Sequence, residues 1–284
     1  MNYTNGSFNW VHRFKHFSMK ILIIGGGNMG MTYAQAFLRS HITTKKDLMI
    51  LEKSEEKWPE LEALDIGSIC KNPEDCLAHA DLVILAVKPQ DSALLFEKIR
   101  SMVDPQQVFL SIMAGVKMST IAQSLGIKKI IRAMPNLPAQ IGMGMTAFTS
   151  TDEVTRIELV TVQNLINTTG KTIYVENETL IDAATAISGS GPAYVWFFMN
   201  AMISAARQVG FNDSESELLV SQTFQGAIDL FHQSDFSCEE WIKKVASKGG
   251  TTEAALASFS QSAVFQDIVN GAVAAFERAK ELGN

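Results

Sequence analysis

The sequence predicts an α/β fold in which an N-terminal Rossmann-type doubly wound sheet precedes an all-helical domain. Three observations support this prediction. Short apolar runs alternate with amphipathic helical patterns between residues 19 and 177, strand patterns stop after residue 177, and a glycine-rich turn, GGGNMG, joins the first apolar run to the first helical pattern. Nearly continuous apolar runs are typical of parallel strands covered on both faces, and their alternation with helices is typical of a doubly wound sheet.

The expected strands lie, in chain order, at residues 20–25, 48–52, 82–87, 108–112, 129–133, 146–149 and 172–175. Amphipathic patterns at residues 29–39 and 154–167 predict two of the helices that cover them, because apolar side chains recur there at helical spacing.

Helix start signals dominate the chain after residue 177. Ser190 precedes Gly191 and Pro192, which suits the first turn of a long helix, and residues 214–217 and 237–240 have the pattern of capping boxes. The long helix, AYVWFFMNAMISAA, is apolar around its whole circumference. A helical domain of this size cannot enclose so much apolar surface alone, so we expect a second copy of the chain to pack against it in a homodimer.

These patterns divide the chain into three segments. Residues 19–177 form the expected dinucleotide-binding sheet domain, and residues 178–284 form the helical domain. Residues 1–18 lack the continuous apolar core of a secretory signal. We interpret them as an extension that the fold does not need, either a disordered tail or the result of a true start at Met19, with a short transit peptide as the alternative.

Composition excludes several classes of protein. The 284 residues carry a net charge of −6, which disfavours nucleic acid or an anionic membrane surface as the main partner. The longest apolar run, residues 195–206, is too short to span a bilayer. Three cysteines without a CxxC pair give no metal site and no disulfide framework, and they suit a reducing cytoplasm.

The glycine-rich turn has the spacing Gly25-x-Gly27-x-x-Gly30, with Asn28 and Met29 between the second and third glycines. The first glycine allows a tight turn, the second lets a pyrophosphate approach the backbone, and the third lets helix and strand pack closely. The helix that follows offers free N–H groups to the phosphates. The turn therefore predicts dinucleotide binding, and a purely structural turn is the alternative.

The end of the second expected strand bears on the choice of cofactor. Glu52 stands where an acidic side chain usually accepts hydrogen bonds from the adenosine ribose, which favours NAD(H) because a carboxylate repels a 2′-phosphate. Lys53, its neighbour, can instead pair with that phosphate and favours NADP(H). The alternative for residues 52–57 is a solvated run of charges.

Two further segments follow strands at the edge where open α/β sheets bind ligands. One holds Ala86, Val87, Lys88 and Pro89, and the other holds Ala114 and Gly115. Small residues and a sharp proline turn leave room there for the ribose and nicotinamide. Ordinary connecting loops are the alternative.

Five motifs, IGGGNMG, AVKPQ, RAMPNLPAQIGMG, SGSGPAYV and VASKGGTTEAAL, occur in this order between residues 19 and 280. Together they resemble the pyrroline-5-carboxylate reductase family, whose members make proline from a cyclic imine. The resemblance implies a helical dimerisation domain, dimers often assembled into larger rings, a cytoplasmic location, and NAD(P)H as reductant, usually NADPH. It also implies cofactor contacts at Gly25–Gly30, Ala86–Pro89 and Ala114–Gly115, and a substrate loop at Gly249, Gly250, Thr251 and Thr252.

The chain differs from the family pattern at three places. Lys248 stands where the family has proline, Leu137 replaces a usual threonine, and Glu52-Lys53 stands where an Asn-Arg or similar pair commonly meets the 2′-phosphate. The first two differences bear on loop stiffness and substrate packing, and the third bears on the preference for NADPH.

The substrate of this family, a cyclic imine carboxylate, sets modest chemical demands. The turn at Lys248, Gly249 and Gly250 leads into a helix whose free N–H groups can hold a carboxylate, with Lys248 adding charge if it points inward; the alternative is that Thr251 only caps this helix. A cyclic imine is basic enough to arrive as the iminium, so the site need only orient it. We expect the Thr252 hydroxyl, or a water, to hydrogen-bond the ring nitrogen.

Two other functions stay open at this point. A β-hydroxyacid dehydrogenase would need a catalytic lysine on the long helix of the second domain, whereas no lysine occurs between Lys171 and Lys243, and His232 is expected on the surface. A non-catalytic dinucleotide sensor or scaffold is the other function, and tight NAD(P)H binding without turnover of any imine would favour it.

Overall fold

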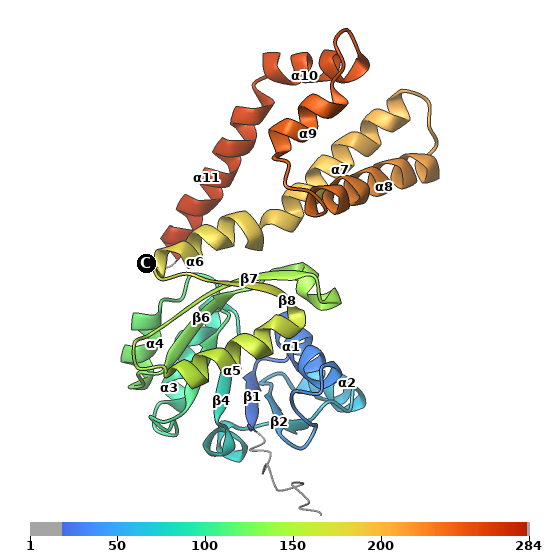
Figure 1. Ribbon diagram of the computed structural model, residues 1–284. Helices are drawn as coiled ribbons and strands as arrows, with labels where there is room; N and C mark the ends of the chain where they lie inside the picture. The colour runs from blue at the N-terminus through green and yellow to red at the C-terminus, as the bar shows by residue number, and fades with distance from the viewer. Residues whose placement is uncertain (1–18, 283–284) are drawn as a thin grey trace, which may run out of the picture.

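The computed structural model describes residues 19–282, so the expectation for residues 1–18 lies outside the described residues. An eight-stranded sheet with the order β3-β2-β1-β4-β5-β6-β7-β8 forms the first half (Figure 1). The strands are β1 Ile21–Ile24, β2 Leu48–Leu51, β3 Ser68–Cys70, β4 Leu82–Leu85, β5 Val108–Ser111, β6 Ile130–Met134, β7 Gly144–Ser150 and β8 Gly170–Tyr174. The strand order reverses between β1 and β4, which is where doubly wound sheets bind ligands. The predicted fold class is confirmed.

Two details of the sheet differ from the expectation. Strand β3 was not predicted, because its three residues, Ser68 to Cys70, form too short a run to stand out from a loop. Strand β7 pairs antiparallel with β6, whereas the other neighbouring strands in the described sheet pair in parallel. The carboxyl ends of β1, β4, β5 and β6 therefore share one edge.

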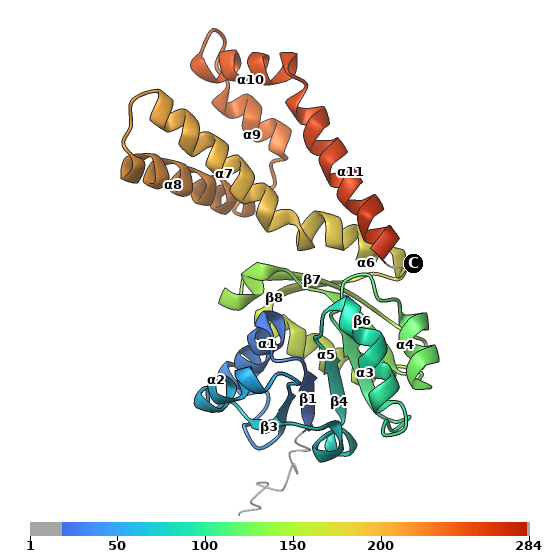
Figure 2. The same cartoon turned by 180° about the vertical axis from the view of Figure 1, so that it is seen from behind.

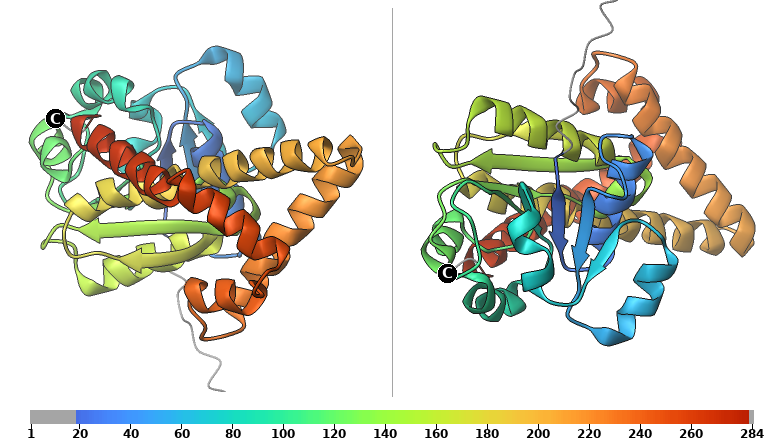
Figure 3. Two further views of the ribbon diagram at one scale, coloured as in Figure 1. Left: turned by 90° about the horizontal axis from the view of Figure 1, so that it is seen from above. Right: turned by 90° about the horizontal axis from the view of Figure 1, so that it is seen from below.

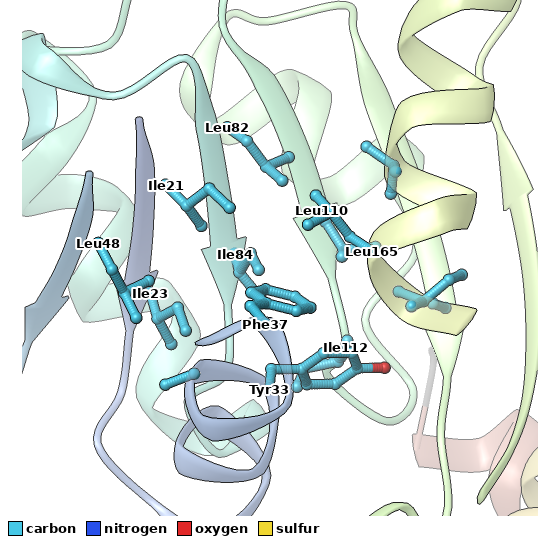
Figure 4. Close-up of a cluster of buried hydrophobic side chains, with 14 of the residues drawn as sticks. Ile21, Ile23, Tyr33, Phe37, Leu48, Leu82, Ile84, Leu110, Ile112 and Leu165 are labelled. Carbon is cyan, nitrogen blue, oxygen red and sulfur yellow. The ribbon is translucent and has the colours of Figure 1, made fainter. Parts of the chain in front are cut away.

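Helices cover both faces of the sheet. They are α1 Asn28–Arg39, α2 Trp58–Ala63, α3 Ser92–Ile99, α4 Met118–Leu125 and α5 Arg156–Ile166. Alternate residues of β1 point to opposite faces: Ile21 and Ile23 pack with Phe37 of α1, and Leu22 and Ile24 pack in a second core with α3 and α4. Figure 4 shows the first of these cores, and Figures 1 and 2 show α5 and α3 on opposite sides of the sheet.

The elements that the structure describes after Glu178 are all helices, as expected, and form an arm that rises from the sheet (Figure 1). The arm contains α6 Thr179–Ala184, a π-helix η7 Thr185–Gly189, α7 Gly191–Gln208, α8 Asp213–His232, α9 Cys238–Val245, α10 Thr251–Gln261 and α11 Val264–Leu282. Large apolar side chains stay exposed on it, including Phe197 at 71% and Phe265 at 80%. A surface of this kind is typical of a face that another chain covers. Among the described helices, none is long and apolar enough to cross a membrane.

Capping boxes set where two helices of the arm, α8 and α9, begin. The predicted capping box at residues 237–240 is confirmed, with Ser237 accepting from the Glu240 N–H. The box predicted at residues 214–217 is wrong, because α8 begins two residues earlier. Asn212 and Glu215 bond reciprocally there, each at 3.0 Å, so the asparagine outcompetes Ser214 as the cap.

A buried ion-pair network joins the sheet to the arm. The side chain of Arg132 on β6 is 1% exposed and donates to Glu178 at 3.0 Å and to Asp182 at 2.6 Å. Glu178 also accepts the Met118 N–H at the start of α4, at 2.8 Å. Because an unpaired charge in this position would be costly, the network holds α6 in one orientation on the sheet.

The last helix makes a second connection. Helix α11 runs back from the tip of the arm across the sheet (Figure 3) and packs against the π-helix η7. Its final residue, Leu282, reaches the loop that follows β5, where a Cβ built on Gly115 would lie 2.9 Å from the Leu282 carbonyl oxygen. The loop after β5 is therefore shaped by the far end of the chain.

Candidate functional site

A cleft of about 460 Å³ opens at the edge of the sheet where the strand order reverses, and we call it the β1–β4 cleft. Of the predicted cofactor residues, Gly25, Gly27, Glu52, Lys53, Ala86, Val87 and Lys88 line it. The remaining predicted residues, Asn28, Met29, Gly30, Pro89, Ala114 and Gly115, lie outside the lining of this cleft.

The glycines at positions 25, 27 and 30 of the first turn lack side chains for two different reasons. Gly25 has a φ of +113°, and a Cβ there would lie 2.6 Å from the Ala86 carbonyl oxygen. A Cβ on Gly30 would lie 2.1 Å from the Gly25 carbonyl oxygen, so helix α1 could not pack on β1 with any larger residue. A Cβ on Gly27 would meet no atom within 4 Å. Packing therefore explains Gly25 and Gly30, whereas Gly27 faces space that is open for a ligand.

The N-terminus of α1 points its unpaired N–H groups into this open space. Gly27 is the N-cap, no side chain caps the helix, and its first turn contains no acidic residue. The first N–H groups of a helix have no partner within the helix and carry a partial positive charge. The residue at this end of α1 that is both exposed and polar is Asn28. This arrangement fits a pyrophosphate.

Glu52 is buried, at 5% exposure, and its carboxylate is held by the backbone. One oxygen accepts the Gly26 N–H at 3.0 Å, and the other accepts the Ser54 N–H at 2.9 Å. The solvated-charge alternative thus fails for Glu52. The Lys53 side chain, in contrast, is 73% exposed and pairs with Asp91 at 2.7 Å, and both residues line the cleft.

Three lysines that the sequence reasoning missed also line the β1–β4 cleft: Lys57, Lys71 and Lys98. The Lys57 ammonium lies 3.5 Å from the Glu52 carboxylate, and the Lys71 ammonium lies 4.5 Å from the centre of the Trp58 ring. Lys71 directly follows β3, the strand that was not predicted, so no signal placed it at this edge. The cleft therefore combines one buried carboxylate with several cations.

Two buried thiols flank Lys71 in the sequence, on Cys70 and Cys76. Cys70 and Cys76 are both free. A hydrogen bond from Cys76 lowers the pKa of the Cys70 thiol, and the same bond together with burial raises the pKa of Cys76. Neither thiol lines the cleft.

The predicted substrate loop lies elsewhere. Gly249 has a φ of +75°, and its N–H donates to the Glu253 carboxylate at 2.6 Å. Gly250 is the N-cap of α10, so Thr251 is the first residue inside the helix and does not cap it. Lys248 is exposed and Thr252 is half-buried. Figure 1 shows the start of α10 at the tip of the arm, far from β1, so a single chain does not bring this loop to the β1–β4 cleft.

A second cavity, of about 500 Å³, lies where the sheet meets the arm, and we call it the junction cavity. Segments after β6, in η7 and at the start of α7 form its lining: Asn136, Pro138, Ile187, Ser188, Gly191, Pro192, Tyr194, Val195, Trp196 and Phe198. The Tyr194 hydroxyl is buried and has no hydrogen-bond partner among the described residues. Tyr194 lies within the motif SGSGPAYV, although no role was predicted for its side chain.

Comparison with known proteins identifies the family. Residues 178–282 match the family described as pyrroline-5-carboxylate reductase dimerisation, and residues 20–115 match the family described as NADP oxidoreductase, coenzyme F420-dependent. Pyrroline-5-carboxylate reductase 2 of Bacillus subtilis is 34% identical over 265 residues, which cover 93% of this chain and 95% of that protein. The chain belongs to the pyrroline-5-carboxylate reductase family. The reductase of Aquifex aeolicus is 35% identical over 237 residues, covering 83% and 86% of the two chains.

Solved structures of this reductase family have the same fold over nearly their whole length. The Plasmodium falciparum pyrroline carboxylate reductase, with NADP bound, is 26% identical with a TM-score of 0.85, covering 94% of this chain and 98% of that one. The Coxiella burnetii pyrroline-5-carboxylate reductase is 28% identical, also with a TM-score of 0.85, covering 94% and 99%. The predicted family resemblance is confirmed, and the match of the arm to a dimerisation family accords with its exposed apolar side chains.

Proposed function

We propose that this chain reduces 1-pyrroline-5-carboxylate to L-proline with NAD(P)H, the last step of proline biosynthesis. The observation that carries the proposal is the full-length match to reductases of this name, in a chain whose Gly27 faces open space at a helix N-terminus. A cytoplasmic location is part of the same proposal.

The residues of the β1–β4 cleft fit a dinucleotide. The N–H groups at the start of α1 hold the pyrophosphate, and Gly27 leaves room for it. Glu52 would meet the adenosine ribose, and the segments at Ala86–Pro89 and Ala114–Gly115 would lie toward the nicotinamide. When bound, the nicotinamide supplies the hydride. The protein supplies binding and orientation.

The substrate loop comes from a second copy of the chain. Lys248, Gly249, Gly250 and Thr251 lie at the tip of the arm, and the exposed apolar helices of the arm are the surface through which two copies pack. The loop holds the substrate carboxylate with the N–H groups at the start of α10, and Glu253 releases the Gly249 N–H when the substrate binds. Dimers of this kind assemble further into a ring.

The chemistry needs little acid catalysis. The substrate enters as the iminium, the hydride reaches the carbon of the C=N bond, and the electron pair of that bond moves to the nitrogen, which already carries its proton. Thr252 hydrogen-bonds the ring nitrogen and so fixes the carbon in line with the hydride donor. The lack of lysine and histidine in α7 accords with this low demand for acid catalysis.

Initial rates of pyrroline-5-carboxylate reduction with NADPH and with NADH, measured on the purified protein, test the proposal. Turnover with either cofactor is expected. Tight cofactor binding without turnover would refute it and would favour a dinucleotide sensor.

A further inference from the structure

The thiols of Cys70 and Cys76 lie against each other at one end of the sheet. Cys70 ends β3, the edge strand of the sheet (Figure 2), and Cys76 follows the 3₁₀-helix Pro73–Asp75. Both side chains belong to the core on the α3 side of the sheet, and the two thiols are hydrogen-bonded to each other. Sulfur atoms in hydrogen-bond contact need only a short movement to reach the length of a disulfide bond, about 2.05 Å.

The surroundings give the two thiols different chemical roles. Cys70 is the more accessible, at 7% exposure against 0% for Cys76, and a small oxidant need reach only Cys70. The hydrogen bond from Cys76 lowers the pKa of Cys70, and the same bond together with burial raises the pKa of Cys76. A thiolate attacks an oxidant, and a neighbouring thiol then resolves the product. Cys70 is therefore placed as the attacking thiol and Cys76 as the resolving thiol.

The segment between the two thiols forms part of the wall of the β1–β4 cleft, which Lys71 and Pro73 line. The Cys70 carbonyl oxygen accepts the Glu52 N–H at 3.4 Å. The Lys71 ammonium lies 4.5 Å from the centre of the Trp58 ring, and the Trp58 indole N–H donates to the Glu52 carbonyl oxygen at 2.8 Å. A movement of Cys70 therefore reaches the residues that would meet the adenosine ribose, a step that rests on the proposed function.

We propose that Cys70 and Cys76 form a reversible disulfide when a peroxide oxidises the protein, and that this bond weakens the binding of the dinucleotide. The Cys70 thiolate attacks one oxygen of hydrogen peroxide, which breaks the O–O bond, forms a sulfenic acid and releases hydroxide. The Cys76 sulfur then attacks the Cys70 sulfur, and the hydroxyl group leaves with the Cys76 proton as water. Two thiols and one peroxide become one disulfide and two waters, and a dithiol reductant reverses the change by exchange. In a reducing compartment, such a disulfide is transient and senses oxidants.

The test uses the full chain with Cys238→Ser, because Cys238 is exposed on α9 and would itself react with peroxide. After treatment with hydrogen peroxide and its removal, we expect the chain to have lost the mass of two hydrogen atoms. The tryptic peptides that hold Cys70 and Cys76 should be joined by a bond that dithiothreitol breaks. The dissociation constant of NADPH, from fluorescence titration, should rise about 3- to 10-fold, the loss of one ordinary hydrogen bond, and should return on reduction. In the control, Cys76→Ala in the same background, peroxide leaves this constant unchanged.

Peptides that stay separate after peroxide treatment would overturn the inference, whether the thiols are unchanged or Cys70 is oxidised alone to the sulfinic acid. Joined peptides with an unchanged dissociation constant would overturn the effect on the cleft. A reduced protein that binds NADPH but does not reduce pyrroline-5-carboxylate would refute the proposed function and leave the inference standing, because neither measurement uses the imine. A reduced protein that binds no NADPH would refute both the placement of the cofactor and the effect on the cleft, while the peptide masses decide the disulfide on their own.

Discussion

We predict that the cofactor preference of this reductase depends on Glu52, and the variant Glu52→Gln tests this prediction. Glu52 is 5% exposed and lines the β1–β4 cleft. In the proposed binding mode it lies at the adenosine ribose, so a 2′-phosphate on that ribose would approach its carboxylate closely. Two unit charges about 4 Å apart repel by roughly 1 kcal/mol in water and roughly 4 kcal/mol at an effective dielectric constant of about 20. Lys57, at 3.5 Å from the carboxylate, offsets part of this repulsion.

We therefore expect Glu52→Gln to raise the ratio of kcat/KM for NADPH to that for NADH by about 1–3 kcal/mol, or roughly 5- to 150-fold. The amide keeps the size of the side chain but has one acceptor oxygen, so either the Gly26 or the Ser54 N–H loses its partner. The free energy of unfolding should fall by about 1–3 kcal/mol. Because both cofactors are measured on the same variant, this loss cancels in the ratio.

Lys53→Gln is the matched control, because its ammonium is exposed and already paired with Asp91. Exposed ion pairs contribute about 0–1 kcal/mol, so we expect the cofactor ratio to change by less than about fivefold. If Glu52→Gln leaves the ratio within twofold of wild type, as judged from initial rates, then Glu52 only supports the glycine turn and the reasoning is refuted.

Three further predictions concern the turn, the loop and the joint. Gly30→Ala should prevent stable folding, since its Cβ would lie 2.1 Å from the Gly25 carbonyl oxygen. Gly27→Ala should keep the melting temperature and weaken NADPH binding at least about tenfold. Equal effects of the two variants on the melting temperature and on the affinity for NADPH, measured in melting and titration experiments, would contradict this. Thr252→Ala should lower turnover while the affinity for NADPH stays the same, and unchanged turnover would remove its proposed role. Arg132→Met should lower the free energy of unfolding by about 3–5 kcal/mol, because two acidic groups lose their buried cation. If urea denaturation shows that this free energy falls by less than about 1 kcal/mol, the network is dispensable.

Much of the fold follows from local patterns that tertiary packing did not override. The apolar runs at Ile21–Ile24 and Leu82–Leu85 became buried central strands because a parallel sheet needs apolar residues on both faces. The sequence pattern did not predict β3, which is short. It predicted the wrong cap for α8, where Asn212 and Ser214 compete. The pairing of β3 with β2 depends on residues that are distant in the sequence, whereas the choice of cap is local and rests on the reciprocal hydrogen bonds between Asn212 and Glu215.

The candidate site was predictable only in part, for a similar reason. The spacing of Gly25, Gly27 and Gly30 predicted a turn whose geometry depends on residues within one strand and one helix. Lys71 could not be placed without β3. Tyr194 lies in an apolar helical segment, where a tyrosine looks like an ordinary core residue. That its hydroxyl is buried without a hydrogen-bond partner among the described residues can be seen only in the folded structure, where the arm meets the sheet.

The contact between Leu282 and the loop at Gly115 has a consequence for the order in which the protein folds. Strands β1, β4 and β5 are complete once the first half of the chain has emerged, so they can pair early in synthesis. The loop after β5, however, meets its packing partner only after α11 has been made. In the nascent chain, the loop after β5 therefore stays uncovered until α11 has been synthesised. A nascent chain stalled before α11 should be cleaved by protease at this loop while the sheet itself resists.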